Sequence, residues 1–230
     1  MISVNILEAC ETGDVSWFKQ QKDNGTLPDL SVEQGYSDAT PIEYACRFGQ
    51  LDVIKWLVEE SGQRIRTKIS PAISSALIYG HLHIVKWIWE DFTSASILAA
   101  KKFNFKPVEN SIQIRVGNTF ALKKAAAAGH VDIFKWLLPL TPPGNDFTIV
   151  AQRAAEAGQL ETLKLIIGHP NTLVNLERCE GWDFAGKKFS QWPEQCINHI
   201  RIAKAVQEFM GVGSWKVARD SKNNIIRNKP

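Results

Sequence analysis

The stretch Thr40-Pro41-Ile42-Glu43-Tyr44-Ala45-Cys46-Arg47-Phe48-Gly49-Gln50-Leu51-Asp52-Val53-Ile54-Lys55-Trp56-Leu57 decides the fold. Thr40 before Pro41 is typical of a helix start, because a hydroxyl caps the first turn and proline fits the first helical position. Apolar residues follow helical spacing both before and after Gly49. A glycine between them suits the left-handed end of a helix. The stretch therefore predicts two short amphipathic helices joined at a glycine corner.

This pattern recurs along the chain. A glycine with Ala four residues before it and Lys six residues after it occurs five times, at Gly13, Gly49, Gly80, Gly129 and Gly158. Trp stands seven residues after the glycine in three copies, as Trp56, Trp87 and Trp136. Neither helix of a pair buries its apolar face alone, so neighbouring pairs must stack. The sequence predicts an all-α solenoid of about five helix-turn-helix units, the first degenerate.

One spacing is longer than the others. The distance from Gly80 to Gly129 indicates an insertion at about residues 91–118, between the third and fourth units. Residues 94–105 predict a short helix, and residues 111–116 alternate like a short strand. Three interpretations stay open: an elongated finger on the binding side, a packing spacer, and a degenerate repeat.

Composition narrows the class of protein. The chain has 230 residues, of which 44% are hydrophobic and 22% charged, which excludes wholesale disorder. No long stretch is free of charge and the first residues lack a basic start, so we expect neither a membrane span nor a secretory signal. Four scattered cysteines do not form a disulfide framework and fit a reducing, cytoplasmic location.

Residues 40–57 resemble the ankyrin-repeat consensus, whose Thr-Pro-Leu-His-x-Ala motif opens a unit of about 33 residues. The resemblance covers residues 5–170. It departs from the family at Glu43, which replaces the usual His, and in the other copies that lack Thr-Pro. The copies after Gly80 and Gly129 are also similar to repeats abundant in giant viruses, amoebae and bacteria that live in amoebae.

The resemblance implies a non-catalytic scaffold that binds a partner protein on its concave surface. In ankyrin repeats the two residues before each glycine point outward on that surface, and we expect partner contacts from Arg47, Phe48, Ile78, Tyr79, Glu11 and Glu156. Arginine and aromatic side chains are enriched in binding hot spots. The alternative is that Phe48 and Tyr79 pack against a neighbouring repeat or the insertion. The partner is a host-cell protein if the chain is a secreted effector, acting in the host cytosol, and we expect a monomer.

The sequence gives only weak indications of a metal site or a catalytic site. His169, Cys179, Cys196 and His199 are enough ligands for zinc, but their spacing is irregular. A Cys196–His199 pair is common by chance on a helix. Cys10 and Cys46 occupy a buried position of the first helix, where cysteine acts as a small apolar residue. We expect the Trp positions to pack between repeats and the recurrent Lys positions to face solvent. No catalytic residue, cofactor or metal is predicted.

The last quarter of the chain differs from the repeats. Residues 171–230 contain ten Lys or Arg and six Asp or Glu. We expect an irregular segment at 175–189 and then a helix with Pro193 in its first turn and an apolar stripe of Ile197, Ile200, Ala203 and Val206. Residues 171–212 are predicted to form a helical cap and residues 213–230 a basic, flexible tail. Nucleic acid is not expected, because no aromatic residues interleave the basic ones after Trp215.

Two alternatives remain for this quarter. Trp192-Pro193-Glu194 has a faint likeness to the F-box-like tails of some poxvirus ankyrin proteins, which would make the protein a substrate adaptor for a ubiquitin ligase. The second alternative is an enzyme whose site lies in residues 171–230.

Overall fold

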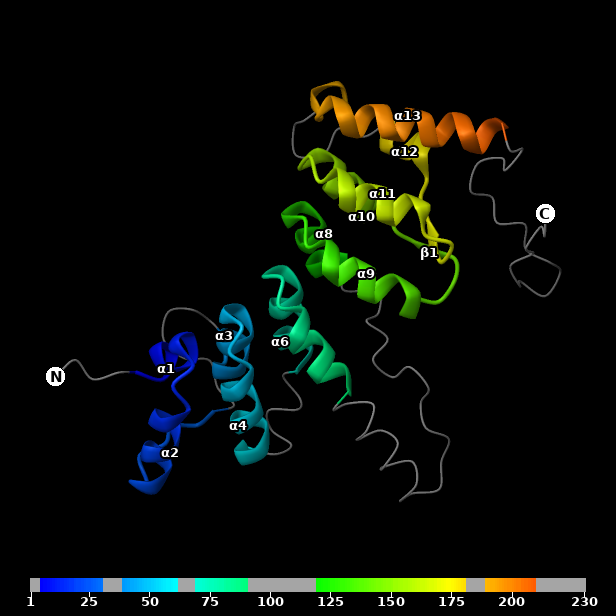
Figure 1. Ribbon diagram of the computed structural model, residues 1–230. Helices are drawn as coiled ribbons and strands as arrows, with labels where there is room; N and C mark the ends of the chain where they lie inside the picture. Colours follow the sequence, from blue (N-terminus) through cyan, green and yellow to red (C-terminus); the bar gives the residue numbers. More distant parts are fainter. Residues whose placement is uncertain (1–4, 31–38, 62–68, 91–118, 181–188, 210–230) are drawn as a thin grey trace, which may run out of the picture. The chain divides into compact units, whose positions relative to one another are not determined.

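The computed structural model describes residues 5–30, 39–61, 69–90, 119–180 and 189–209, and these are mostly helical (Figure 1). The chain divides into two compact units, residues 1–121 (unit 1) and residues 122–230 (unit 2), which are described separately.

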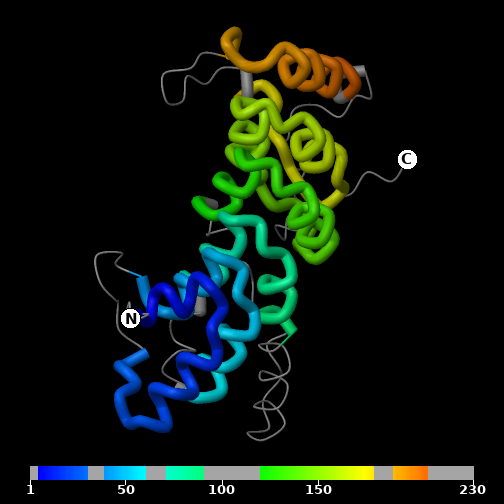
Figure 2. Tube along the Cα trace, turned by 60° about the vertical axis from the view of Figure 1, so that its left-hand side comes forward, coloured from blue at the N-terminus to red at the C-terminus, as the bar shows by residue number. Residues whose placement is uncertain are grey.

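Unit 1 is built from consecutive helix pairs, which we call repeats 1 to 3. The first helices pack side by side, α3 between α1 and α6, and α2 packs against α4 (Figure 2). Residues 82–90 form the second helix of repeat 3. The other helices are α1 (Ile6–Thr12), α2 (Val15–Asp23), α3 (Pro41–Phe48), α4 (Leu51–Ser61) and α6 (Ile69–Ile78).

Unit 2 continues the same arrangement. Repeat 4 is α8 with α9, and the boundary between the units falls after the third residue of α8. Repeat 5 is α10 with α11, and α9 and α10 both pack against α11. Two-residue strands β1 and β2 precede α10 and α12 and pair in parallel. The elements are α8 (Thr119–Ala128), α9 (Val131–Leu140), β1 (Asn145–Asp146), α10 (Thr148–Glu156), α11 (Leu160–Gly168), β2 (Thr172–Leu173), α12 (Leu176–Glu180), η2 (Phe189–Gln191) and α13 (Glu194–Phe209).

The glycine corners have the predicted backbone. Gly13, Gly49, Gly80, Gly129 and Gly158 all have φ between 77° and 82°, a conformation that glycine adopts without steric cost. At the start of repeat 2, the Glu43 carboxylate accepts hydrogen bonds from the Thr40 amide at 2.6 Å and the Thr40 hydroxyl at 2.9 Å. The departure from the family motif at Glu43 therefore serves as a cap for α3.

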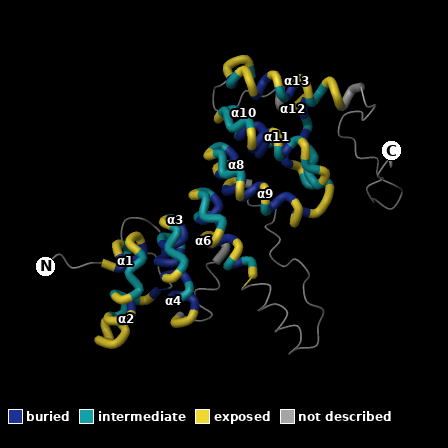
Figure 3. Tube along the Cα trace, in the orientation of Figure 1, coloured by how far each residue is buried: buried dark blue, intermediate teal, exposed yellow. Residues whose placement is uncertain are grey.

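The core lies where helices of one unit meet (Figure 3). The alanine four residues before each corner glycine is completely buried: Ala9, Ala45, Ala76, Ala125 and Ala154. Trp56 is also buried and lies 5.1 Å, centroid to centroid, from the Phe18 ring of repeat 1. Trp56 therefore packs between repeats, as expected. Of the recurrent lysines, Lys19, Lys86, Lys135 and Lys164 are exposed, and Lys55 is half-buried.

α6 begins at Ile69, so Pro71 is its third residue, which is tolerated because first-turn amides have no intrahelical partner. Two local expectations were wrong. Residues 176–180, expected to be irregular, form α12. Pro193 precedes α13, and its carbonyl accepts hydrogen bonds from the Cys196 and Ile197 amides.

α13 is placed as the second helix of a sixth repeat. Residues one position after a corner glycine lie against the glycine of the preceding repeat: Gln50 on Gly13, His81 on Gly49 and Gln159 on Gly129. Pro193 occupies this place on Gly158, with its Cγ 3.2 Å from the position of an added Cβ. Trp192 therefore stands at the glycine position. α13 packs on α11 and α10, and α12 packs on α10 as a shortened first helix.

The outer surface of α13 differs from that of the inner repeats. Arg201 is exposed at the position where Val58 and Leu138 are buried. Ile197 and Ile200 are buried as expected, but Val206 is 54% exposed and does not continue the buried stripe. The second helices of other repeats end earlier, so Val206 lies beyond the surface that α11 covers.

Several expectations fall outside the described residues: the insertion at 91–118 with its predicted helix and strand, and the tail at 213–230. No described helix has the length and apolar character needed to cross a bilayer.

Candidate functional site

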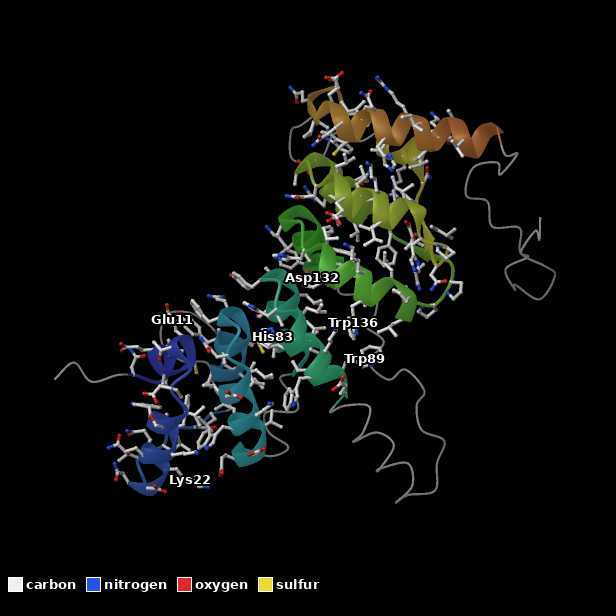
Figure 4. All side chains as sticks on the ribbon, in the orientation of Figure 1. Glu11, Lys22, His83, Trp89, Asp132 and Trp136 are labelled. Carbon is white, nitrogen blue, oxygen red and sulfur yellow. The ribbon has the colours of Figure 1, made fainter. Side chains whose placement is uncertain are left out.

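The residues before each corner glycine form a row across the first helices of unit 1. Glu11, Arg47 and Ile78 each stand two residues before a corner glycine, at the ends of α1, α3 and α6, and α3 packs against both neighbouring helices. Glu11 is exposed at the end of α1 (Figure 4). Phe48 is 37% exposed and Tyr79 is 47% exposed, which is high for large apolar side chains. We call this row the first-helix surface of unit 1.

Arg47 lies at the centre of an aromatic cluster on this surface. Its Cζ atom is 5.5 Å from the ring centroid of Tyr44 and 5.5 Å from that of Tyr79. The rings of Tyr44 and Phe48 are 5.1 Å apart. Both Arg47 distances are within the range of cation–π attraction. We define the aromatic cluster as Tyr44, Arg47, Phe48 and Tyr79.

Tyr44 was not among the predicted site residues. It precedes Arg47 by three positions and Phe48 by four, so all three share one helix face. Helical spacing alone was therefore a sufficient signal to find it.

A hydrogen bond from each repeat to the one before it fixes the row. The Gln50 Nε2 donates to the Glu11 carbonyl at 2.7 Å, and the His81 Nε2 lies 2.8 Å from the Arg47 carbonyl. Because a carbonyl only accepts, His81 Nε2 must carry its proton. The His83 Nε2 lies 3.2 Å from the Gly49 carbonyl. Both histidines thus contact backbone carbonyls of repeat 2.

The positive charge of Arg47 is not neutralised by the described part of the chain. No carboxylate of these residues forms an ion pair with its guanidinium. The Glu43 carboxylate is engaged with Thr40. The Arg47 Nε is buried and makes no hydrogen bond to any residue that the structure describes.

The corresponding row in unit 2 has small side chains. Ala127 and Ala128 precede Gly129, and Glu156 and Ala157 precede Gly158. The same inter-repeat bond is present, from Gln159 Nε2 to the Ala127 carbonyl at 3.3 Å. The Glu156 carboxylate pairs with Arg153 at 2.7 Å. The predicted residue Glu156 therefore lies in unit 2, with its charge already neutralised.

The cysteines do not form a reactive site among the described residues. Burial raises the pKa of Cys10 to about 12, and burial, with a smaller contribution from Glu43, raises the pKa of Cys46 further. Burial also raises the pKa of Cys196, while burial and then the nearby Lys164 charge lower the pKa of His199. A neutral thiol is a poor nucleophile, so this pair is not activated. No group of three metal-ligating side chains occurs in the described ranges, which do not include the Cys179 side chain.

The location of the F-box-like segment does not support the adaptor alternative. Trp192, which carries it, is 5% exposed, and Ile197 and Ile200 are buried in the sixth repeat. These side chains pack inside unit 2.

Comparison with known proteins supports the repeat assignment. Residues 42–149, just under half of the chain, match the family described as ankyrin repeats (3 copies). No curated protein matched the chain. Residues 42–149 therefore contain ankyrin repeats, and the described helix pairs before and after them are of the same kind, which fits an all-α ankyrin solenoid. Ankyrin repeats are generally non-catalytic protein–protein interaction modules.

Proposed function

We propose that this protein is a scaffold that binds a partner protein through the first-helix surface of unit 1. The contacts come from Arg47, Phe48, Ile78 and Tyr79, with Glu11 at the edge and Tyr44 supporting the cluster. The observation that carries the proposal is the exposure of Phe48 and Tyr79 around an arginine. Large aromatic and arginine side chains contribute most of the binding energy at many interfaces.

The ankyrin fold supports the same conclusion. The inter-repeat hydrogen bonds hold the backbone of the row, so the exposed side chains bind without first ordering the chain. The likeness of the repeats to those of viral and amoeba-associated bacterial proteins supports a host-cell protein as the partner and the host cytosol as the place of action.

Affinity capture tests the proposal. The full chain and the double variant Phe48→Ala/Tyr79→Ala are used as baits, and captured proteins are re-tested as purified pairs. The variant is expected to lose at least about tenfold in affinity for the partner, because hot-spot truncations cost about 2 kcal/mol or more. Its thermal transition is expected to stay close to that of the parent, because both side chains are substantially exposed.

The chain offers a matched control. Ile202 and Val206 are 61% and 54% exposed on α13, so Ile202→Ala/Val206→Ala removes comparable apolar surface from unit 2. This control is expected to bind normally. Equal binding by the parent and the Phe48/Tyr79 variant would contradict the proposal, and unfolding of that variant would show that the two rings belong to the core.

A further inference from the structure

The inference concerns the chemistry of the partner and rests on the proposed function. A guanidinium directs its N–H donors in its own plane, whereas ring faces attract the charge without accepting those donors. The two tyrosine rings, at 5.5 Å each, therefore position Arg47 but do not satisfy its hydrogen bonds. No carboxylate of the described residues satisfies them either.

Unit 2 provides an internal comparison. Arg153 stands five residues before its corner glycine, and Glu156 stands two before, the position that Arg47 has in repeat 2. There the chain supplies a carboxylate at 2.7 Å from the guanidinium. The end of a first helix thus accommodates an arginine–carboxylate pair, whereas repeat 2 has Arg47 at the later of these two positions and Tyr44 at the earlier one.

The surroundings of Arg47 favour one kind of occupant. Phe48, the next residue in the sequence, and Tyr79, whose ring lies 5.5 Å from the Arg47 Cζ atom, both offer exposed apolar area. The nearby acid Glu43 is engaged with Thr40. We propose that the partner presents an Asp or Glu side chain to Arg47, next to an apolar residue that contacts Phe48 and Tyr79. A planar carboxylate matches the paired donors of arginine, and such charged hydrogen bonds are stronger than neutral ones.

The probe is a set of immobilised ten-residue peptides with a central Glu flanked by Leu and Phe. Matched sets replace Glu with Gln, Lys or phosphoserine. The full chain is expected to bind the Glu set about tenfold or more tightly than the Gln set, since hydrogen bonds to charged groups carry that much affinity. Lys peptides are expected to bind weakest.

Variants of Arg47 test whether this residue causes the preference for Glu peptides over Gln peptides. Arg47→Gln is expected to remove the difference between Glu and Gln peptides, and Arg47→Lys to retain part of it, because lysine keeps the charge but not the paired donors. Lys86→Gln is the control: it removes one positive charge from an exposed position of unit 1 and is expected to preserve the preference. Thermal unfolding of each variant checks its folding, and Arg47→Lys serves if Arg47→Gln does not fold.

The outcomes separate this inference from the proposed function. Equal binding of Glu and Gln peptides that still depends on Phe48 and Tyr79 overturns the carboxylate inference and leaves the binding surface intact. Preference for phosphoserine over Glu, or retention of no Glu peptide, also overturns it. If no substitution at Arg47, Phe48 or Tyr79 alters peptide binding, both the carboxylate inference and the proposed binding surface are overturned.

Discussion

Unit 1 and unit 2 use one backbone design for two different surfaces. In each, a polar side chain after the corner glycine hydrogen-bonds to the preceding repeat: His81 to Arg47 and Gln159 to Ala127. Above this shared framework, unit 1 presents Arg47, Phe48 and Tyr79, whereas unit 2 presents mainly alanines. The difference teaches that stacking and recognition are encoded at separate positions, so each can be altered without the other.

The largest expected effect comes from the glycine corners. An added Cβ at Gly49 would lie 2.9 Å from the His81 ring, whereas at Gly129 it would meet the flexible amide of Gln159. A ring packed between repeats moves less easily than an amide. Gly49→Ala is therefore expected to lower the free energy of unfolding by about 2–3 kcal/mol, through the left-handed backbone and the displaced ring, and Gly129→Ala by about 1–2 kcal/mol.

Urea unfolding followed by circular dichroism measures both changes. Gly25→Ala is the control for the backbone term alone, since Gly25 has φ of 67° and open space around its Cβ position. We expect it to cost about 1 kcal/mol. If Gly25→Ala and Gly49→Ala cost the same, the contact with His81 contributes nothing.

The next effect comes from the inter-repeat hydrogen bond. His81→Ala removes a bond of 2.8 Å and is expected to cost about 1–1.5 kcal/mol, whereas Gln159→Ala removes one of 3.3 Å and is expected to cost about 0.5–1 kcal/mol. Chemical unfolding gives both values. A larger loss for Gln159→Ala would reverse the comparison between the units.

Replacing a buried thiol is expected to change the free energy of unfolding less at neutral pH than at alkaline pH. The pKa of Cys10 is raised from 9.0 to about 12 in the folded protein, so folding is favoured by the neutral thiol. This contribution is fully present below the unfolded pKa of about 9 and is lost as pH rises toward 12. Cys10→Ala is expected to flatten the decline of unfolding free energy between pH 9 and 11, as measured by chemical unfolding at each pH. A decline of equal slope in both proteins would contradict the assignment.

The smallest effect is expected at the ion pair of unit 2. Glu156→Gln is expected to cost about 0.5 kcal/mol and to leave partner binding unchanged, because its carboxylate serves Arg153 and not the surface of unit 1. Calorimetry and the purified binding assay test these two statements. A clear loss of partner binding by Glu156→Gln would show that Glu156 belongs to the binding surface.

Much of the fold was predictable because the repeat amplifies weak signals. One Ala–Gly–Lys spacing is ambiguous, but five in phase restrict the chain to stacked helix pairs, and the left-handed glycines confirm the corners. The sixth repeat was not predictable, because Trp192 and Pro193 replace the glycine and polar residue that mark the other corners. The sixth repeat is recognised in the structure because Pro193 lies against Gly158.

The candidate surface was predictable in its members but not in its organisation. The positions before each glycine follow from the repeat, and the exposure of Phe48 and Tyr79 agrees with that expectation. The approach of Tyr79 to Arg47 joins residues of different repeats. Such a contact depends on how two helices pack, which sequence spacing within one helix does not specify.

The sequence by itself determined the helix pairs, their corners and the recurrent alanine positions, because helix periodicity and glycine conformation are local properties. Only the tertiary structure decided which charges are neutralised. Arg153 finds its carboxylate within one helix turn, whereas Arg47 is positioned by a ring from the next repeat and forms no ion pair with a described residue. Neutralisation depends on distances between side chains that are fixed only when the repeats stack.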